Sequence, residues 1–157
     1  MNNVDVVVTS LERAPALIIP LVREVPQAIL KRRPKPGKWS AHEHACHLAT
    51  VHPVLTARLD LMLTQQRPRI VSYFPSADEE DGASLKVDLD EAMERFSTDR
   101  QRLVQRLRGL SAEEWHRTAD HEEYAQYSVF IMFRHLAMHD MLHAYRIEEL
   151  LLKNDWT

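Results

Sequence analysis

Histidine is the residue type in this chain whose number and spacing could support chemistry. The chain has nine histidines in 157 residues, and His135, His139 and His143 recur at every fourth position. Positions i and i+4 of an α-helix lie on one face, about 6 Å apart along the axis, so two such imidazoles can hold one divalent cation. A second group lies far earlier in the chain: His44, His47 and His52. Because helical bundles build metal sites from facing helices, the two groups together predict a site between two helices.

The alternative is that these histidines are core residues bonded to their neighbours. His139 and His143 share one helix face with apolar side chains: Met132, Leu136, Ile147 and Leu150. Burying two imidazoles without partners is costly, which favours a ligand role for the pair. His135 lies at the edge of this face, and spacing alone leaves both interpretations open. His42 and His44 fall in the first turn of their helix, where we expect exposure.

The elements that would position these histidines are helical. Apolar residues recur at intervals of three and four in four segments: residues 4–30, 40–64, 88–109 and 128–153. Ser40 with Glu43 forms a capping box, and Ser128 is the expected N-cap of the last segment. A short helix is expected from Ser111 to Trp115. Long amphipathic segments without strand alternation predict an all-α fold, a four-helix bundle.

The connections between the helices are marked by proline and polar residues. Three prolines predict a kink or a break in the first segment: Pro15, Pro20 and Pro26. Pro53 predicts a bend near Ala49 in the second segment. Residues 65–87 read as a long irregular connection between the second and third helices, which would cover a pocket or carry a crossover. Residues 116–127 are polar and read as a loop.

Composition excludes several classes of function. The net charge is -3, whereas nucleic-acid binders are usually basic, so we expect no nucleic-acid partner. The basic residues of one turn read as a solvated helix end: Lys31, Arg32, Arg33, Lys35 and Lys38. The single cysteine, Cys46, excludes a disulfide framework and reads as a small core residue. Neither a leader nor a membrane segment is visible, so a single cytoplasmic domain over residues 1–157 is expected, with no membrane partner.

Two motifs carry a resemblance to a known family. Residues 35–48 read KPGKWSAHEHACHL, and residues 134–147 read RHLAMHDMLHAYRI. The first resembles the signature P-x-x-W-[ST]-x-x-E-x-x-x-H-[LIV] of the DinB/YfiT-like superfamily. The second is similar to that family's H-x-x-x-H-x-x-[QRH]-[IL]. The order of the helices around the motifs is also similar along the whole chain, which indicates membership of this superfamily.

The resemblance implies a four-helix bundle with a divalent metal held by three histidines. Carried over residue by residue, the ligands are His47, His139 and His143, because the residues after His143 match the family's offset. His135 then stays outside the site. Zinc is the expected metal, and nickel, iron and manganese also accept imidazole ligands.

The family resemblance also bears on activity. Family members are similar to thiol-dependent transferases and to maleylpyruvate isomerase, and others are stress-response proteins without an assigned reaction. The resemblance therefore implies a metal-dependent transferase or hydrolase-like enzyme that acts on a small molecule with a low-molecular-weight thiol. The alternative is a non-catalytic helical bundle that binds a metal or a small molecule.

Three residues near the motifs have expected roles beside the metal. His52 and Arg146 are candidate substrate contacts, because His52 would line the same cavity and Arg146 could hold a carboxylate. An ordinary salt bridge is the alternative for Arg146. Glu43 is first a capping residue, and second an acceptor for a ligand imidazole.

Further residues are expected to have structural roles. Asp140 should point away from its neighbour His139 and face solvent, and Trp39 should pack under the first helix. Tyr73 and Phe74 would offer an exposed apolar patch for a homodimer.

Overall fold

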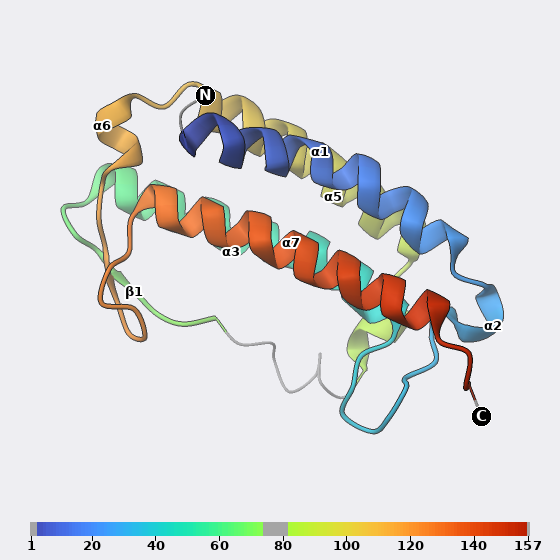
Figure 1. Cartoon of the computed structure of the whole chain (residues 1–157). Coiled ribbons are helices and arrows are strands. Elements are labelled where there is room, and N and C mark those ends of the chain that lie inside the picture. The colour runs from blue at the N-terminus through green and yellow to red at the C-terminus, as the bar shows by residue number, and fades with distance from the viewer. Residues whose placement is uncertain (1–2, 74–81, 157) are drawn as a thin grey trace.

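Four long helices make up most of the chain (Figure 1). The computed structural model describes residues 3–73 and 82–156. The long helices are α1 (Asn3–Glu24), α3 (Ala41–Thr64), α5 (Leu89–Arg108) and α7 (Val129–Leu152). α1 and α3 each pack against both α5 and α7. The bundle therefore places α1 diagonally opposite α3, and α5 diagonally opposite α7. The predicted all-α four-helix bundle is confirmed.

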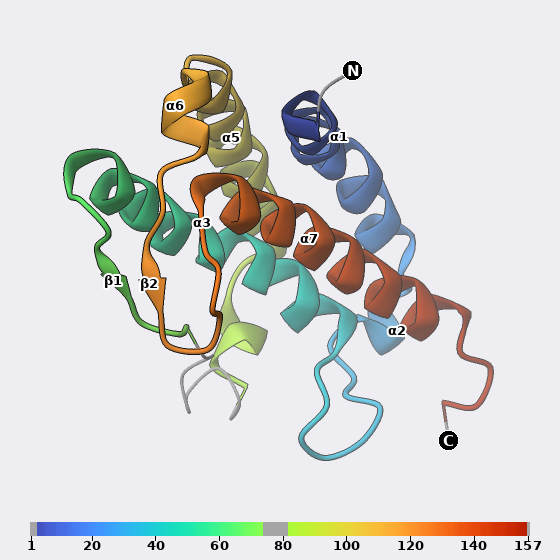
Figure 2. The same cartoon turned by 60° about the vertical axis from the view of Figure 1, so that its left-hand side comes forward.

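The long connection between α3 and α5 is a crossover. Figures 1 and 2 show that α3 and α5 run in the same direction, so the chain returns along the bundle between them. The described part of this connection contains strand β1 (Arg69–Ile70) and the short 3₁₀ helix η1 (Ala83–Lys86). β1 pairs in parallel with β2 (Asp120–His121), which precedes α7. The sequence predicted no strand, because two residues are too few to show an alternation.

The helices begin where their caps predict. The Ser40 hydroxyl accepts from the backbone N–H of Glu43 at 3.2 Å, and the Glu43 carboxylate accepts from the backbone N–H of Ser40 at 2.9 Å. These two bonds complete the capping box of α3. Ser128 caps α7, and Ser111 caps the short helix α6 (Ala112–Trp115).

The break predicted in the first segment falls at Pro26. α1 continues through two prolines, and α2 (Gln27–Leu30) follows the break. The first of these prolines, Pro15, has no N–H to donate to the carbonyl of Leu11 four residues earlier. Arg100 Nη1 donates to that carbonyl instead, at 2.9 Å. A side chain from α5 therefore supplies the hydrogen bond that Pro15 cannot make.

The bundle core consists of two apolar clusters with a charged pair between them. One cluster includes Leu11, Leu59, Leu107 and Phe133, and the other includes Ile18, Leu48, Phe96 and Ile147. Between them, Arg100 on α5 and Asp140 on α7 form an ion pair whose side chains are 1% and 0% exposed. Two hydrogen bonds join them, Nη1 to Oδ2 at 2.6 Å and Nη2 to Oδ1 at 3.1 Å. The prediction that Asp140 faces solvent is wrong, because α1 and α3 both cover α7 and this side chain points into the core between them.

The predictions about the burial of Cys46 and about the exposure of Tyr73 and Phe74 have different outcomes. Cys46 is buried, as predicted. Tyr73 packs partly buried against the core instead of forming an exposed patch, and Phe74 lies outside the described residues. None of the described helices has the length and apolar character that spanning a bilayer requires.

Candidate metal centre

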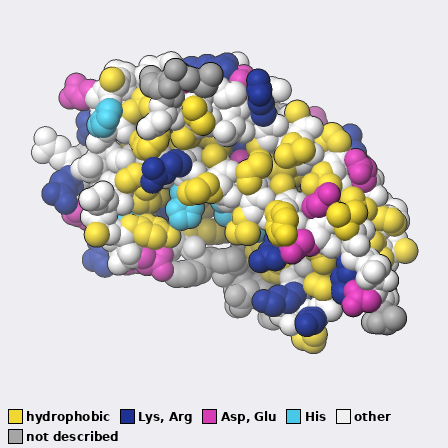
Figure 3. Space-filling view, in the orientation of Figure 1, with side chains coloured by type: hydrophobic (Ala, Val, Ile, Leu, Met, Phe, Trp, Pro, Cys, Tyr) yellow, Lys and Arg dark blue, Asp and Glu magenta, His cyan; other side chains and the backbone are white. Residues whose placement is uncertain are grey.

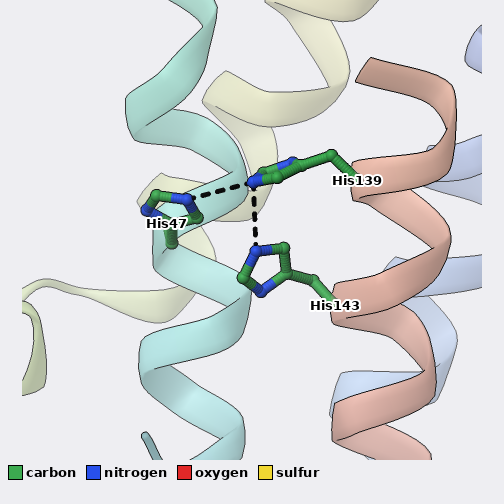
Figure 4. Close-up of side chains that lie close together, drawn as sticks. All are labelled: His47, His139 and His143. Atoms are coloured by element: carbon green, nitrogen blue, oxygen red, sulfur yellow. Dashed lines mark hydrogen bonds between the residues drawn. The ribbon is translucent and has the colours of Figure 1, made fainter. Parts of the chain in front are cut away.

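Three histidines meet at the interface between α3 and α7 (Figure 4). His47 comes from α3, and His139 and His143 come from α7. Nε2 of His139 lies 3.2 Å from Nε2 of His47 and 3.1 Å from Nε2 of His143. One ring nitrogen of each histidine lies within 4.8 Å of the other two. The structure therefore brings together the three residues that the family resemblance assigns as ligands.

The three rings cannot satisfy one another by hydrogen bonds alone. Each neutral imidazole nitrogen carries one proton or one lone pair in the ring plane. Nε2 of His139 can therefore make one good hydrogen bond, although it has two nitrogen neighbours. In tetrahedral coordination, zinc–nitrogen bonds of about 2.0–2.1 Å would place two ligand nitrogens about 3.3–3.4 Å apart, close to the two short distances here. The spacing and the chemistry of this donor set fit a divalent cation.

A fourth histidine, His44, contacts this cluster through the second ring nitrogen of His143. Its Nδ1 lies 2.8 Å from Nδ1 of His143. If Nε2 of His143 offers its lone pair to the centre, Nδ1 of His143 carries the proton and donates a hydrogen bond to Nδ1 of His44. Metal ligands commonly use their second N–H in this way, which fixes the orientation of the ring. Sequence analysis missed this role, although His44 lies three residues before His47 and thus on a neighbouring part of the same helix face.

Burial keeps the histidines of this cluster neutral. Desolvation, with neighbouring histidines as a smaller cause, lowers the pKa of His139 to about 4 and that of His143 to about 2. Desolvation likewise lowers the pKa of His44 to about 4. A neutral imidazole has a lone pair to offer, so burial favours the protonation state that a metal ligand needs.

The histidines open into a cavity of about 330 Å³ between α3, α7 and the segment that contains β2. The Trp39 ring forms part of its wall, with its centroid 4.8 Å from that of His47 and 6.0 Å from that of His143. Trp39 thus packs on the candidate ligands and not under α1, which corrects the prediction. Figure 3 shows histidine side chains at the surface among apolar ones, in the middle of the visible face. A small molecule in this cavity would lie directly against the cluster.

Comparison with known proteins places the chain in one family. The model of the DinB superfamily matches residues 10–147. The chain belongs to the DinB superfamily. Among solved structures, it is similar to YfiT from Bacillus subtilis, described as a probable metal-dependent hydrolase with an unusual four-helix bundle topology. The TM-score is 0.87 at 23% sequence identity, over 98% of this chain and 89% of YfiT. This likeness shows a shared fold. No curated protein matches the chain.

Two other histidines of this DinB protein lie near the centre in sequence. His135 is exposed on the rim of the cavity and outside the cluster, as the resemblance implies. His52 is buried against Phe96 of α5, with ring centroids 5.8 Å apart, and does not line the cavity. The expectation that His52 lines the cavity is wrong, because five residues rotate it about 140° around α3 from His47, toward the core, and a substrate contact by His52 is not supported.

Two charged candidates are also engaged elsewhere. Arg146 Nη1 lies 2.6 Å from Oε2 of Glu149, and Arg146 does not line the cavity. The salt bridge expected as the alternative is thus present, and the substrate contact is not supported. The Glu43 carboxylate accepts hydrogen bonds from Arg33 and Ser40 and contacts no imidazole of the described residues. It acts as the capping residue, and the basic turn supplies its counter-charge.

The first turn of α3 is covered, contrary to the prediction of exposure. His42 is 1% exposed, and its Nε2 lies 3.0 Å from the carbonyl oxygen of Ser84 in η1. His44 is half-buried. The crossover packs on this end of α3, and local sequence could not show that contact.

Proposed function

We propose that this DinB protein is a metal-dependent enzyme in which His47, His139 and His143 hold a divalent cation. The observation that carries the proposal is the convergence of three Nε2 atoms, two pairs of them 3.1 and 3.2 Å apart, on the wall of a cavity. Zinc is the first choice, and nickel, iron and manganese are alternatives because imidazole does not discriminate sharply among these ions.

The proposed reaction is a transfer or hydrolysis with a low-molecular-weight thiol or water as nucleophile. A divalent cation with three protein ligands keeps open positions, and when bound it acidifies a water or thiol and polarises a carbonyl group. Membership of the DinB superfamily supports the metal-dependent part of this proposal. YfiT, described as a probable metal-dependent hydrolase, is in line with it. The thiol rests on the family resemblance of the two sequence motifs.

The residues around the centre have separate tasks in this proposal. His44 holds the ring of His143 in the orientation that directs Nε2 inward. Trp39 covers the cluster on one side. Val51 and Leu136 give the cavity an apolar wall, which limits the water that can reach a bound substrate.

Turnover by the zinc-loaded protein tests the proposal. Glutathione, mycothiol and bacillithiol would each be offered with a panel of electrophiles and esters, and products followed by mass spectrometry. We expect turnover that chelation and His143→Ala abolish. His116→Ala is the matched control, because His116 is an exposed histidine outside both the cluster and the cavity and should keep the activity. Turnover that survives chelation would overturn the proposal, as would its absence with every thiol and with water.

One observation favours a non-catalytic binding protein as the second candidate. Glu123 is the acidic residue among the described residues that line the cavity, and its carboxylate accepts from the Ser72 hydroxyl at 2.8 Å. The described wall therefore places no unengaged carboxylate beside the cluster to serve as a general base. Tight binding of a panel member without turnover would support this candidate.

A further inference from the structure

The cavity continues from the histidine cluster along one face of α3. His47, Val51, Leu55 and Arg58 all line it. Their spacing of four, four and three residues keeps them on one helix face, and eleven residues span about 16 Å of helix. The cavity is therefore elongated, with the histidine cluster at one end and Arg58 at the other.

Arg58 is a cation with donors to spare at the far end. Its Nη2 donates to the carbonyl oxygen of Val71 at 2.7 Å, and its charge lies near the hydroxyl of the buried Tyr127. This bond holds the guanidinium in place but uses only one of its five N–H donors. No carboxylate of the described residues forms an ion pair with Arg58. A half-buried, fixed and unpaired guanidinium is suited to bind an anion.

Aromatic rings surround this end of the cavity. The His121 centroid lies 4.5 Å from that of Tyr127 and 4.6 Å from that of Tyr124. Nδ1 of His121 accepts from the backbone N–H of Glu123 at 3.1 Å, so the proton of the neutral ring is on Nε2, which is a second donor. Planar rings of this kind provide a surface on which a flat group can stack.

The middle of the cavity is apolar, which separates its two polar ends. Leu55 and Val51 of α3 and Leu136 and Met132 of α7 line this part. Ligand sites commonly combine apolar walls with a few placed polar groups that fix the orientation of the ligand.

We propose that Arg58, with Tyr127 and His121, forms the acid-binding end of the cavity, and that the ligand is an elongated carboxylic acid with an apolar or aromatic body. The carboxylate pairs with Arg58, the body lies along Leu55 and Leu136, and the opposite end of the molecule reaches the histidine cluster. The identity of this opposite end as the reacting end rests on the proposed function, whereas binding of the acid at Arg58 does not.

Calorimetry with a matched pair of probes tests the acid-binding end. The probes are 4-phenylbutyrate and its uncharged amide, titrated into metal-stripped protein so that the carboxylate cannot bind a metal. Arg58→Gln removes the charge, and Arg58→Lys keeps it. Arg102→Gln is the matched control, because Arg102 is an exposed residue of α5 outside the cavity. Metal content is measured for every variant.

The expected result is that the wild type binds the acid at least about tenfold more tightly than the amide, in keeping with a charged hydrogen-bonded pair. Arg58→Gln should abolish this preference, Arg58→Lys should keep part of it, and Arg102→Gln should keep all of it. Equal binding of acid and amide by the wild type would overturn the proposal, as would an unchanged preference in Arg58→Gln or no binding of the acid. Unaltered metal content in Arg58→Gln would show that the metal centre is intact. The outcome for the acid-binding end is then independent of the outcome for the metal centre.

Discussion

Two polar clusters lie in the middle of the same bundle, and adjacent residues of α7 contribute to both. Asp140 pairs with Arg100 in the core, where the guanidinium also donates to the Leu11 carbonyl. His139 points to the other side, where three imidazole nitrogens face one another. The carboxylate of the first cluster is matched by charge and by hydrogen bonds, whereas in the second Nε2 of His139 faces two ring nitrogens and can form a good hydrogen bond with only one of them. The first cluster thus holds helices together, and the second is suited to bind a ligand.

The same burial has opposite consequences in the two clusters. In the ion pair, attraction and hydrogen bonds offset the cost of removing two charges from water, so loss of one partner leaves a buried charge. In the histidine cluster, desolvation keeps the rings neutral, and no charge is stranded when one ring is lost. This contrast predicts which substitutions cost stability and which cost metal.

Breaking the ion pair should have the largest effect on folding. Asp140→Ala leaves the Arg100 guanidinium buried without its counter-charge, and we expect a loss of about 3–5 kcal/mol in the free energy of unfolding. Urea denaturation of the metal-free protein measures it. The double change Arg100→Met with Asp140→Leu leaves no charge behind and should recover much of the loss. A cost for Asp140→Ala below about 1 kcal/mol would remove the contrast between the clusters.

Removing one candidate ligand should have the opposite profile. His139→Ala leaves two ligands and should lower zinc affinity by more than about 100-fold, beyond the effect of losing an outer partner. The stability of the metal-free protein should change far less than in Asp140→Ala. Competition with a chromogenic chelator measures affinity, with His135→Ala as the control. Unchanged affinity in His139→Ala would show that the cluster is not the metal site.

His44 should affect affinity without being a ligand. His44→Ala removes the group that faces Nδ1 of His143 and should lower zinc affinity by about 10–100-fold. His44→Gln retains an acceptor and should recover part of the affinity. The zinc content at saturation should stay at one ion per chain in both variants. Loss of the ion itself in His44→Gln would mean that His44 is a ligand and would change the proposed ligand set.

The pH dependence of the free energy of unfolding should depend on His52, which is buried against Phe96. Desolvation, helped by the charge of Arg100, lowers the pKa of His52 to about 3. The unfolded chain binds a proton at His52 below about pH 6.5, whereas the folded chain does not, so stability falls as pH drops from 7 toward 3. Between pH 7 and pH 5, metal-free His52→Leu should lose about 2 kcal/mol less stability than the wild type. Denaturation curves at the two pH values measure this, with the exposed His116→Leu as the control; equal losses in His52→Leu and the wild type would contradict the prediction.

The parts of the molecule that local sequence encodes were predicted well. The caps Ser40, Ser111 and Ser128 mark true helix starts, because capping depends on residues within one turn. The four-residue spacing of His139 and His143 placed both on one face, and the family motif added His47 as the third member.

Features that depend on distant packing could not be predicted in the same way. Asp140 and His42 are polar residues at positions that looked solvent-exposed, but Arg100 and the crossover bury them. Helix periodicity tells which residues share a face, but not how many faces of a helix are covered. The role of Arg58 depends likewise on where β2 and Tyr127 lie relative to α3.

Elemental mass spectrometry of the untagged protein tests the central claim most directly. After reconstitution with zinc, nickel or manganese, we expect about one divalent ion per chain in the wild type and in His52→Leu, and none in His47→Ala or His139→Ala. No ion in the wild type under any of these conditions would contradict the account. The three histidines would then be cavity residues, and both polar clusters of the bundle would serve its structure.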